Sequence, residues 1–204
     1  MVFNILTMII SLFGPDGVGK TTKASVLSEQ LCLPVMSGTN IASWQDDSWY
    51  KSFVTRGINE GEINNPDHFY EKIYRAHQEA ARVDDIYGGV ILDSDPAHKR
   101  FIFQHVLGNN MAGVALRHET LIAHSPERER LQLDVRVSRN GTNDQHASEL
   151  QRRINQRGAS IFDPRTTEAS LAAIHASSEL ATQLHSIGQR VITIYSDEID
   201  SHII

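Results

Sequence analysis

The sequence predicts an α/β domain in which helices cover both faces of a five-stranded parallel sheet, giving three layers. Two observations support this prediction. Short runs of almost wholly apolar residues, typical of strands that are buried on both faces, recur along the chain. Segments with apolar residues at helical spacing separate them, and strands that alternate with helices are typical of a parallel sheet.

The strands are expected, in chain order, at residues 8–13, 33–36, 90–93, 131–135 and 191–195. The first is nearly all apolar and ends at Gly14, which is followed by a proline. The third follows Gly88 and Gly89, which predict an interruption of regular secondary structure. The position of the fourth strand is open, because residues 120–123 are also apolar and are an alternative to residues 131–135.

Helices are expected at residues 20–31, 67–83, 98–107, 147–156 and 166–187. The first carries Ala24, Leu27 and Leu31 at helical spacing, which provides one apolar face for the sheet. The last is rich in alanine and ends at Gly188. Residues 40–65 are rich in aromatic and acidic side chains and predict an irregular segment.

Length and composition predict a single domain over residues 1–204. The 204 residues are 40% hydrophobic and 22% charged, which is ordinary for a globular protein. The net charge of −6 argues against a dedicated nucleic-acid-binding protein, and no apolar stretch is long enough to predict a membrane span. The single cysteine, Cys32, excludes an internal disulfide and fits the reducing cytoplasm. We therefore expect a cytoplasmic protein.

The strongest motif lies between the first strand and the first helix. Residues 14–22 (GPDGVGKTT) match the pattern G-x-x-x-x-G-K-[ST] in its required context of strand, loop and helix. The three glycines allow the backbone to wrap its amide groups around a phosphate, and the helix N-terminus adds further N–H groups. The motif predicts a P-loop NTPase fold with ATP and Mg²⁺ as cofactors.

Three side chains of this loop have specific expected roles. Lys20 reaches the β- and γ-phosphates, the Thr21 hydroxyl binds Mg²⁺, and Thr22 hydrogen-bonds the α-phosphate. The expected nucleotide-binding residues are Gly14, Asp16, Gly17, Val18, Gly19, Lys20, Thr21 and Thr22.

The rest of the sequence narrows the class of nucleotide-binding protein. The guanine-specific motif N-K-x-D of GTPases is absent from the sequence. The D-x-x-G spacing from Asp85 to Gly88 does not follow an apolar strand, so we give it no weight. A motor protein would be expected to carry a further partner-binding domain. A compact chain with one phosphate loop therefore favours a kinase of a small molecule or nucleotide.

An acidic residue ends the third expected strand. Because parallel strands end at the same edge of a sheet, Asp93 is expected near the phosphate loop. There it would hold Mg²⁺ or orient the acceptor oxygen, and Asp95 would share that role. The alternative is that Asp93 caps the helix that follows.

Four segments together resemble the thymidylate kinase family. The phosphate loop is similar, including the acid at Asp16, and residues 74–77 (YRAH) resemble that family's D-R-A-x-H segment. Residues 90–93 followed by Phe103 and Gln104 resemble its V-I-x-D-R-Y and A-Y-Q stretches. The strand 133–135 (LDV) and the Arg-rich residues 149–158 resemble its strand and lid.

The resemblance implies a role for further residues. Asp16 would contact the sugar of the acceptor and Arg75 would bind the monophosphate of the acceptor, whereas Gln104 and an aromatic near Phe69 or Tyr70 would hold its base. A lid at about residues 147–165 would supply Arg152, Arg153 and Arg157 to the transferring phosphoryl group. The alternatives are a solvated helix face for the lid arginines, and a surface ion pair of Arg75 with Glu71 or Glu79.

The sequence also departs from that family. Ser94 stands where the family has arginine, residues 136–146 form an extra polar loop, and residues 44–50 have no counterpart. The expected activity is ATP-dependent phosphoryl transfer to a (deoxy)nucleoside monophosphate, with Lys20, Asp93, Arg153 and Arg157 as catalytic residues.

Two alternatives to this activity remain open. One is a kinase of a nucleoside, a modified nucleotide or another metabolite, and the other is a nucleotide-dependent switch acting on a protein. The expected partner is a small-molecule acceptor, without nucleic acid or membrane and with a homodimer left open.

Overall fold

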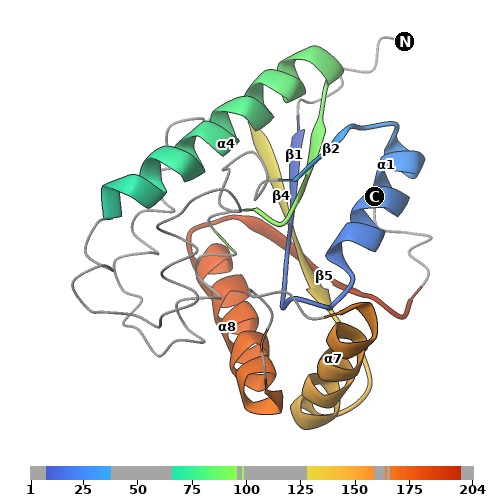
Figure 1. Cartoon of the computed structure of the whole chain (residues 1–204). Helices are drawn as coiled ribbons and strands as arrows, with labels where there is room; N and C mark the ends of the chain where they lie inside the picture. The colour runs from blue at the N-terminus through green and yellow to red at the C-terminus, as the bar shows by residue number, and fades with distance from the viewer. Residues whose placement is uncertain are drawn as a thin grey trace.

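The computed structural model describes residues 8–37, 66–95, 98, 128–158, 164 and 166–198, and for residues 66–73 it describes the backbone only. Five strands form one sheet in the order β2-β3-β1-β4-β5, and every neighbouring pair is parallel (Figure 1). The strands are β1 (Met8–Phe13), β2 (Val35–Ser37), β3 (Val90–Asp93), β4 (Glu129–Arg136) and β5 (Arg190–Tyr195). The predicted five-stranded parallel sheet is confirmed.

The pairing of the central strand β1 with β3 and β4 brings Asp93, at the end of β3, and Asp134 of β4 to one edge of the sheet. In β1, Ile9 pairs with Val90 of β3, and Phe13 pairs with Asp134 of β4. Because all the strands run in the same direction, their carboxyl ends lie at the edge where the chain leaves β1 and enters the phosphate loop. Ligands of open α/β sheets bind at this edge.

Helices cover both faces of the sheet, as the three-layer prediction requires. The helices are α1 (Lys20–Leu31), α4 (Pro66–Tyr87), α7 (Asn143–Arg157) and α8 (Thr167–Ser186). Successive residues of β1 point to opposite faces. Ile10 and Leu12 pack with residues of α1 and α7, whereas Ile9 packs with α4 and Phe13 with α8. Figure 1 shows α1 and α7 on one side of the sheet and α4 and α8 on the other.

The strand and helix boundaries differ from the predictions in several places. The second strand spans Val35–Ser37 instead of 33–36, and α4 continues to Tyr87 instead of ending at 83. The fourth strand is confirmed at β4, but the competing segment 120–123 lies outside the described residues. The expected helix 98–107 also lies outside them, apart from His98, which is helical.

The start of α7 corrects the extra polar loop expected at 136–146. The helix begins at Asn143 because Thr142 and Gln145 form a capping box. The Thr142 hydroxyl accepts from the Gln145 backbone, and the Gln145 side chain accepts from the Thr142 backbone. The first turn of α7 therefore occupies residues assigned to a loop. Within the described ranges, no helix is both long and apolar enough to cross a membrane.

Candidate active site

The phosphate loop joins the end of β1 to the start of α1 through three glycines with positive φ. Gly14, Gly17 and Gly19 have φ of 141°, 85° and 103°, which are conformations that side-chain-bearing residues rarely adopt. Space is equally restrictive at two of them. A Cβ on Gly14 would lie 2.4 Å from the carbonyl oxygen of Val135, and one on Gly17 would lie 2.9 Å from Ile154 Cγ1. The loop therefore needs glycine at both positions.

The N-terminus of α1 suits an anion. The N-cap residue is Gly19, and within the described part of the chain no side chain caps the helix and no acidic residue lies in its first turn. Its first N–H groups and the positive end of the helix dipole are thus left for a ligand, as in sites that bind phosphates. The loop and helix together fit the triphosphate of a nucleotide.

The ammonium group of Lys20 is held against the phosphate loop. Its Nζ donates hydrogen bonds to the carbonyl oxygens of Gly14 at 2.9 Å and Pro15 at 2.8 Å. It also lies 3.5 Å from Asp16 Oδ1, and the side chain is 8% exposed. These contacts place a positive charge at the loop, where the sequence predicts that it meets the β- and γ-phosphates.

Thr21 and Asp93 meet beside the loop. The Thr21 hydroxyl donates to Asp93 Oδ2 at 2.7 Å, so the first turn of α1 is joined to the end of β3. Hydroxyl and carboxylate oxygens are ligands that Mg²⁺ accepts, and nucleotide phosphates and water complete its shell in many kinase sites. The donor set therefore fits the magnesium ion expected here, with Thr21 and Asp93 as the residues that would hold it.

Ser94, which follows this carboxylate, has a positive φ of 61° although it is not glycine. Its hydroxyl lies 3.4 Å from Asp93 Oδ1. Such conformations cost free energy and persist where the surrounding contacts hold the backbone. Here the backbone is fixed on both sides of Ser94, because Asp93 accepts a hydrogen bond from Thr21 and Asp95 accepts one from Ser11.

Asp95 belongs to a buried network and not to an open surface. Its side chain is 1% exposed, and its Oδ2 accepts from the Ser11 hydroxyl at 3.2 Å. Its Oδ1 lies 3.1 Å from His77 Nε2. Burial lowers the pKa of the neighbouring His98, although the charge of Asp95 opposes that shift. These contacts of Asp95 stabilise the turn that follows β3. A role for Asp95 in binding the acceptor stays a prediction.

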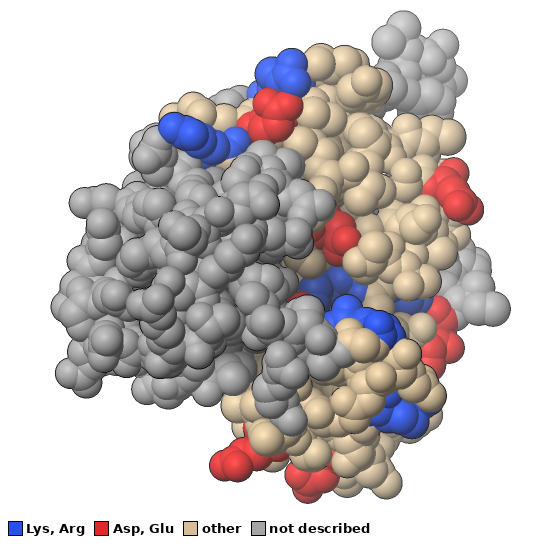
Figure 2. Space-filling view, viewed as in Figure 1, with Lys and Arg blue, Asp and Glu red and all other residues tan. Residues whose placement is uncertain are grey.

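Of the three arginines predicted to belong to a lid, Arg153 lies against the phosphate loop. Its Nη1 donates to the carbonyl oxygen of Val18 at 3.3 Å and to Ser196 Oγ at 2.9 Å. Its Nε donates to Glu149, which also accepts from Arg152. These hydrogen bonds, led by that of Arg152, lower the pKa of Glu149 to about 2. Figure 2 shows basic side chains gathered where α7 meets the loop.

The remaining predicted site residues are exposed on helices or lie outside the described side chains. Arg157 and Arg75 are both exposed, on α7 and α4 respectively. Of the two suggested partners of Arg75, Glu79 makes an ion pair with Arg82 at 2.6 Å, and Glu71 lies outside the described side chains. The following lie outside the described side chains: Phe69, Tyr70, Gln104, residues 44–50, and lid residues 159–163 and 165. Their roles stay predictions.

Residues that follow β5, which the sequence did not indicate as functional, contact the phosphate loop and α1. Ser196 Cβ lies 3.4 Å from where a Cβ on Gly19 would be, and Ser196 Oγ receives the hydrogen bond from Arg153. Lys23 Nζ donates to the carbonyl oxygen of Glu198 at 2.6 Å. The signal in the sequence that could have found these residues is their position directly after a predicted strand, because the carboxyl ends of parallel strands form the edge at which ligands bind.

Comparison with protein-family models and with curated proteins found no match. Solved structures do match over nearly the whole chain. A deoxyadenosine kinase from M. mycoides with bound dATP has a TM-score of 0.60 and 14% identity, over 94% of this chain and 93% of that one. A shikimate kinase from Bacteroides thetaiotaomicron has a TM-score of 0.53 and 17% identity, over 96% and 90%. The chain therefore has the α/β fold of the P-loop kinases.

Proposed function

We propose that this protein transfers the γ-phosphoryl group of ATP to a small acceptor of the nucleoside class. The observation that carries the proposal is the hydrogen bond between Thr21 and Asp93, beside a glycine-lined loop that holds Lys20. A loop that only bound a phosphate would not need a carboxylate from another strand at this point. Phosphoryl transfer does need one, to organise the metal and the acceptor.

Each part of the site has a task in that reaction. The loop amides and the N-terminus of α1 bind the phosphate oxygens, and Lys20 neutralises part of their charge. Magnesium, when bound, polarises the transferring phosphoryl group. Asp93 orients the acceptor hydroxyl and accepts its proton as the new bond to phosphorus forms. Arg153 adds a positive charge where α7 meets the loop.

The acceptor is proposed to be a nucleoside. Ser94 follows Asp93, where the thymidylate kinase family has arginine, so the residue next to the carboxylate supplies no charge for an acceptor phosphate. The similarity of fold to a deoxyadenosine kinase is compatible with an uncharged acceptor. A nucleoside hydroxyl also gives Asp93 a proton to accept, which a phosphate oxygen at neutral pH would not.

A nucleoside monophosphate is the second candidate. It is favoured by Arg75, which is exposed on α4 and lies in the segment 74–77 that resembles the thymidylate kinase family. The guanidinium group of arginine suits bidentate binding of a phosphate. This candidate keeps the same donor, the same loop and the same role for Lys20.

An acceptor panel tests the proposal. Purified protein is incubated with γ-labelled ATP, Mg²⁺ and each of the common deoxynucleosides and deoxynucleoside monophosphates, and the products are separated. Labelled monophosphates support the first candidate, and labelled diphosphates support the second. ATP hydrolysis that no acceptor stimulates, with no labelled nucleotide product, would contradict both and favour the nucleotide-dependent switch.

The Lys20→Ala variant is the control for the chemistry. We expect it to lose transfer by about 100-fold or more, because a charged group at the phosphates is removed. Arg82→Ala is the matched surface variant, since Arg82 makes an exposed ion pair on α4 away from the loop, and it should transfer normally.

A further inference from the structure

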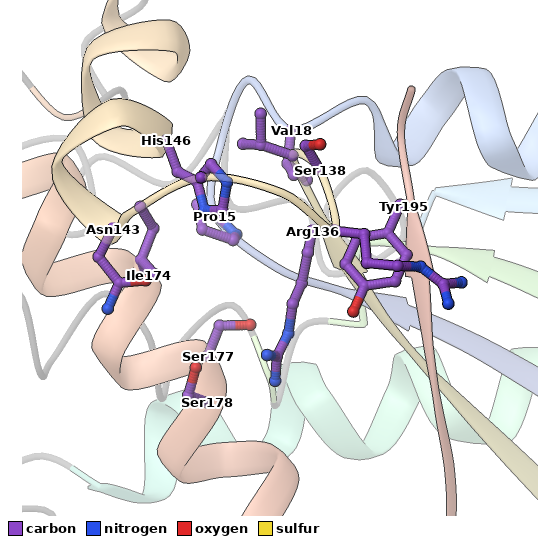
Figure 3. A pocket seen from close by; sticks show the side chains of 13 residues that line it. Pro15, Val18, Arg136, Ser138, Asn143, His146, Ile174, Ser177, Ser178 and Tyr195 are labelled. Atoms are coloured by element: carbon purple, nitrogen blue, oxygen red, sulfur yellow. The ribbon is translucent and has the colours of Figure 1, made fainter. Parts of the chain in front are cut away.

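A cavity of about 210 Å³ lies beside the phosphate loop, between the end of β4, the start of α7 and the middle of α8 (Figure 3). Pro15 and Val18 of the loop form part of its wall. Lys20, Thr21 and Asp93 do not line it. The cavity therefore adjoins the phosphate loop through Pro15 and Val18 but does not include the residues expected to hold the metal.

The wall of the cavity is basic. Among the described residues that line it are Arg136, Arg139 and His146, and none of them is Asp or Glu. The chain as a whole carries a net charge of −6, so this composition runs against the general charge of the protein. Arg139 is engaged by Glu198 at 3.0 Å and lies over the ring of Tyr195 at 5.1 Å. Arg139 binds Glu198 through both Nε and Nη2, whereas Arg136 binds Asp134 through Nε alone, so Arg136 is the arginine that keeps its Nη groups for a ligand.

One edge of the Arg136 guanidinium is anchored and the other is open. Its Nε donates to Oδ2 of Asp134 at 2.7 Å, and Asp134 is fully buried. The Ser177 hydroxyl donates to Oδ1 of the same carboxylate at 3.0 Å. Within the part of the chain that the structure describes, the two Nη groups of Arg136 have no hydrogen-bond partner. The buried carboxylate thus holds the guanidinium in one orientation and leaves its Nη groups for another molecule.

Two hydroxyl groups complete the open side. Across the described ranges, neither the Ser178 nor the Tyr195 hydroxyl has a hydrogen-bond partner, although both residues line the cavity. Figure 3 shows both side chains and Arg136 extending into the same space. Ile174 and Val18 contribute an apolar part of the wall. The cavity thus offers donors for an oxyanion beside a surface for a short carbon skeleton.

We propose that this cavity binds a small molecule through a phosphate or carboxylate group, with Arg136 as its principal ligand. A guanidinium group binds such planar or tetrahedral oxyanions with two parallel hydrogen bonds. Ser178 and Tyr195 donate to the remaining oxygen atoms. Both anion types share this chemistry, so the experiment includes one probe of each.

Isothermal titration of the full chain tests the proposal with inorganic phosphate, succinate and, as an uncharged control, glycerol. We expect phosphate or succinate to bind saturably and glycerol not to bind. Arg136→Gln should weaken binding by about tenfold or more, because hydrogen bonds from a charged donor are lost. Arg82→Gln, which changes an exposed arginine of α4 that does not line the cavity, should leave the affinity unchanged.

A double variant, Ser178→Ala with Tyr195→Phe, covers the case in which Arg136→Gln fails to fold because Asp134 loses its partner. It removes two hydroxyl groups that make no described hydrogen bond, and it should weaken binding by about five- to tenfold. Phosphate binding that no cavity variant weakens would assign the ion to the phosphate loop and overturn the proposal. The absence of saturable binding of both anions up to about 10 mM would overturn it too.

Discussion

The Thr21 hydroxyl donates a hydrogen bond of 2.7 Å to Asp93 Oδ2 across 72 residues of sequence. Thr21 stands in the first turn of α1 and Asp93 is the last residue of β3. The strand pairing Ile9↔Val90 sets the distance between them, because it places the ends of β1 and β3 at the same edge. The contact between these two residues, which we propose to bind magnesium, is therefore a product of sheet register.

The first prediction concerns this pair. Asp93→Asn should lower the rate of phosphoryl transfer by about 100-fold or more, since the carboxylate charge and its proton-accepting capacity are lost together. Thr21→Val should raise the Mg²⁺ concentration needed for half-maximal rate, whereas Thr21→Ser, which keeps the hydroxyl, should stay close to the unsubstituted protein. Steady-state rates at a series of Mg²⁺ concentrations measure both effects. Equal Mg²⁺ dependence in Thr21→Val and Thr21→Ser would argue against a metal-binding role for Thr21.

The second prediction concerns Arg153. Arg153→Ala removes the contacts with Val18 and Ser196, and should lower the transfer rate by about 1,000-fold, the lower end of the range known for arginines that stabilise transferring phosphates. Folding should be weakened by about 1–2 kcal/mol, because the side chain is only 27% exposed and its hydrogen bonds to Val18, Ser196 and Glu149 are lost. Rate and urea unfolding are measured together. A loss of stability without a loss of rate would show that Arg153 only fastens α7 to the loop.

The third prediction separates steric clash from backbone strain. Gly14→Ala should lower the free energy of unfolding by about 3 kcal/mol or more, because the new Cβ would lie 2.4 Å from the carbonyl oxygen of Val135. Gly188→Ala is the matched control, since its φ is 79° and no atom of the described residues lies within 4 Å of the new Cβ. It should cost about 1–2 kcal/mol, from conformation alone. Urea unfolding gives both values, and equal losses would contradict the prediction.

The fourth prediction concerns pH. The folded-state pKa of Glu149 is lowered from 4.5 to about 2, chiefly by its hydrogen bond from Arg152. A lowered folded pKa stabilises the protein at pH values above the unfolded value, and this stabilisation is lost as the pH falls from about 4.5 to about 2. Because these side chains are partly exposed, we expect the contribution to be about 0.5–1 kcal/mol.

The measurement for Glu149 compares urea unfolding at pH 7 and pH 3. Glu149→Gln removes the titrating group, so the variant should be less stable than the unsubstituted protein at pH 7 and closer to it at pH 3. A constant difference between the two proteins at both pH values would show that the ion pairs contribute nothing to stability.

The sequence predicted what depends on residues close together in the chain. The loop 14–22 is a contiguous segment, and its motif predicts glycines with positive φ followed by a lysine and a hydroxyl side chain. The structure has the three glycines in that conformation, with Lys20 and Thr21 at the start of α1. The apolar runs predicted the parallel sheet, since burial on both faces leaves a signal in each strand separately. The start of α7 was missed because a capping box of polar residues, Thr142 to Gln145, was interpreted as a loop.

What the tertiary structure alone decided is which distant residues meet. Nothing near Ser196 in the chain indicates that it contacts Arg153, and nothing near Asp134 indicates that it anchors Arg136 beside a cavity. These contacts arise because parallel strands far apart in sequence end at one edge, and register and helix packing then choose the side chains that touch. Local patterns record the preference of each segment, but a contact between segments is specified only when all of them fold together.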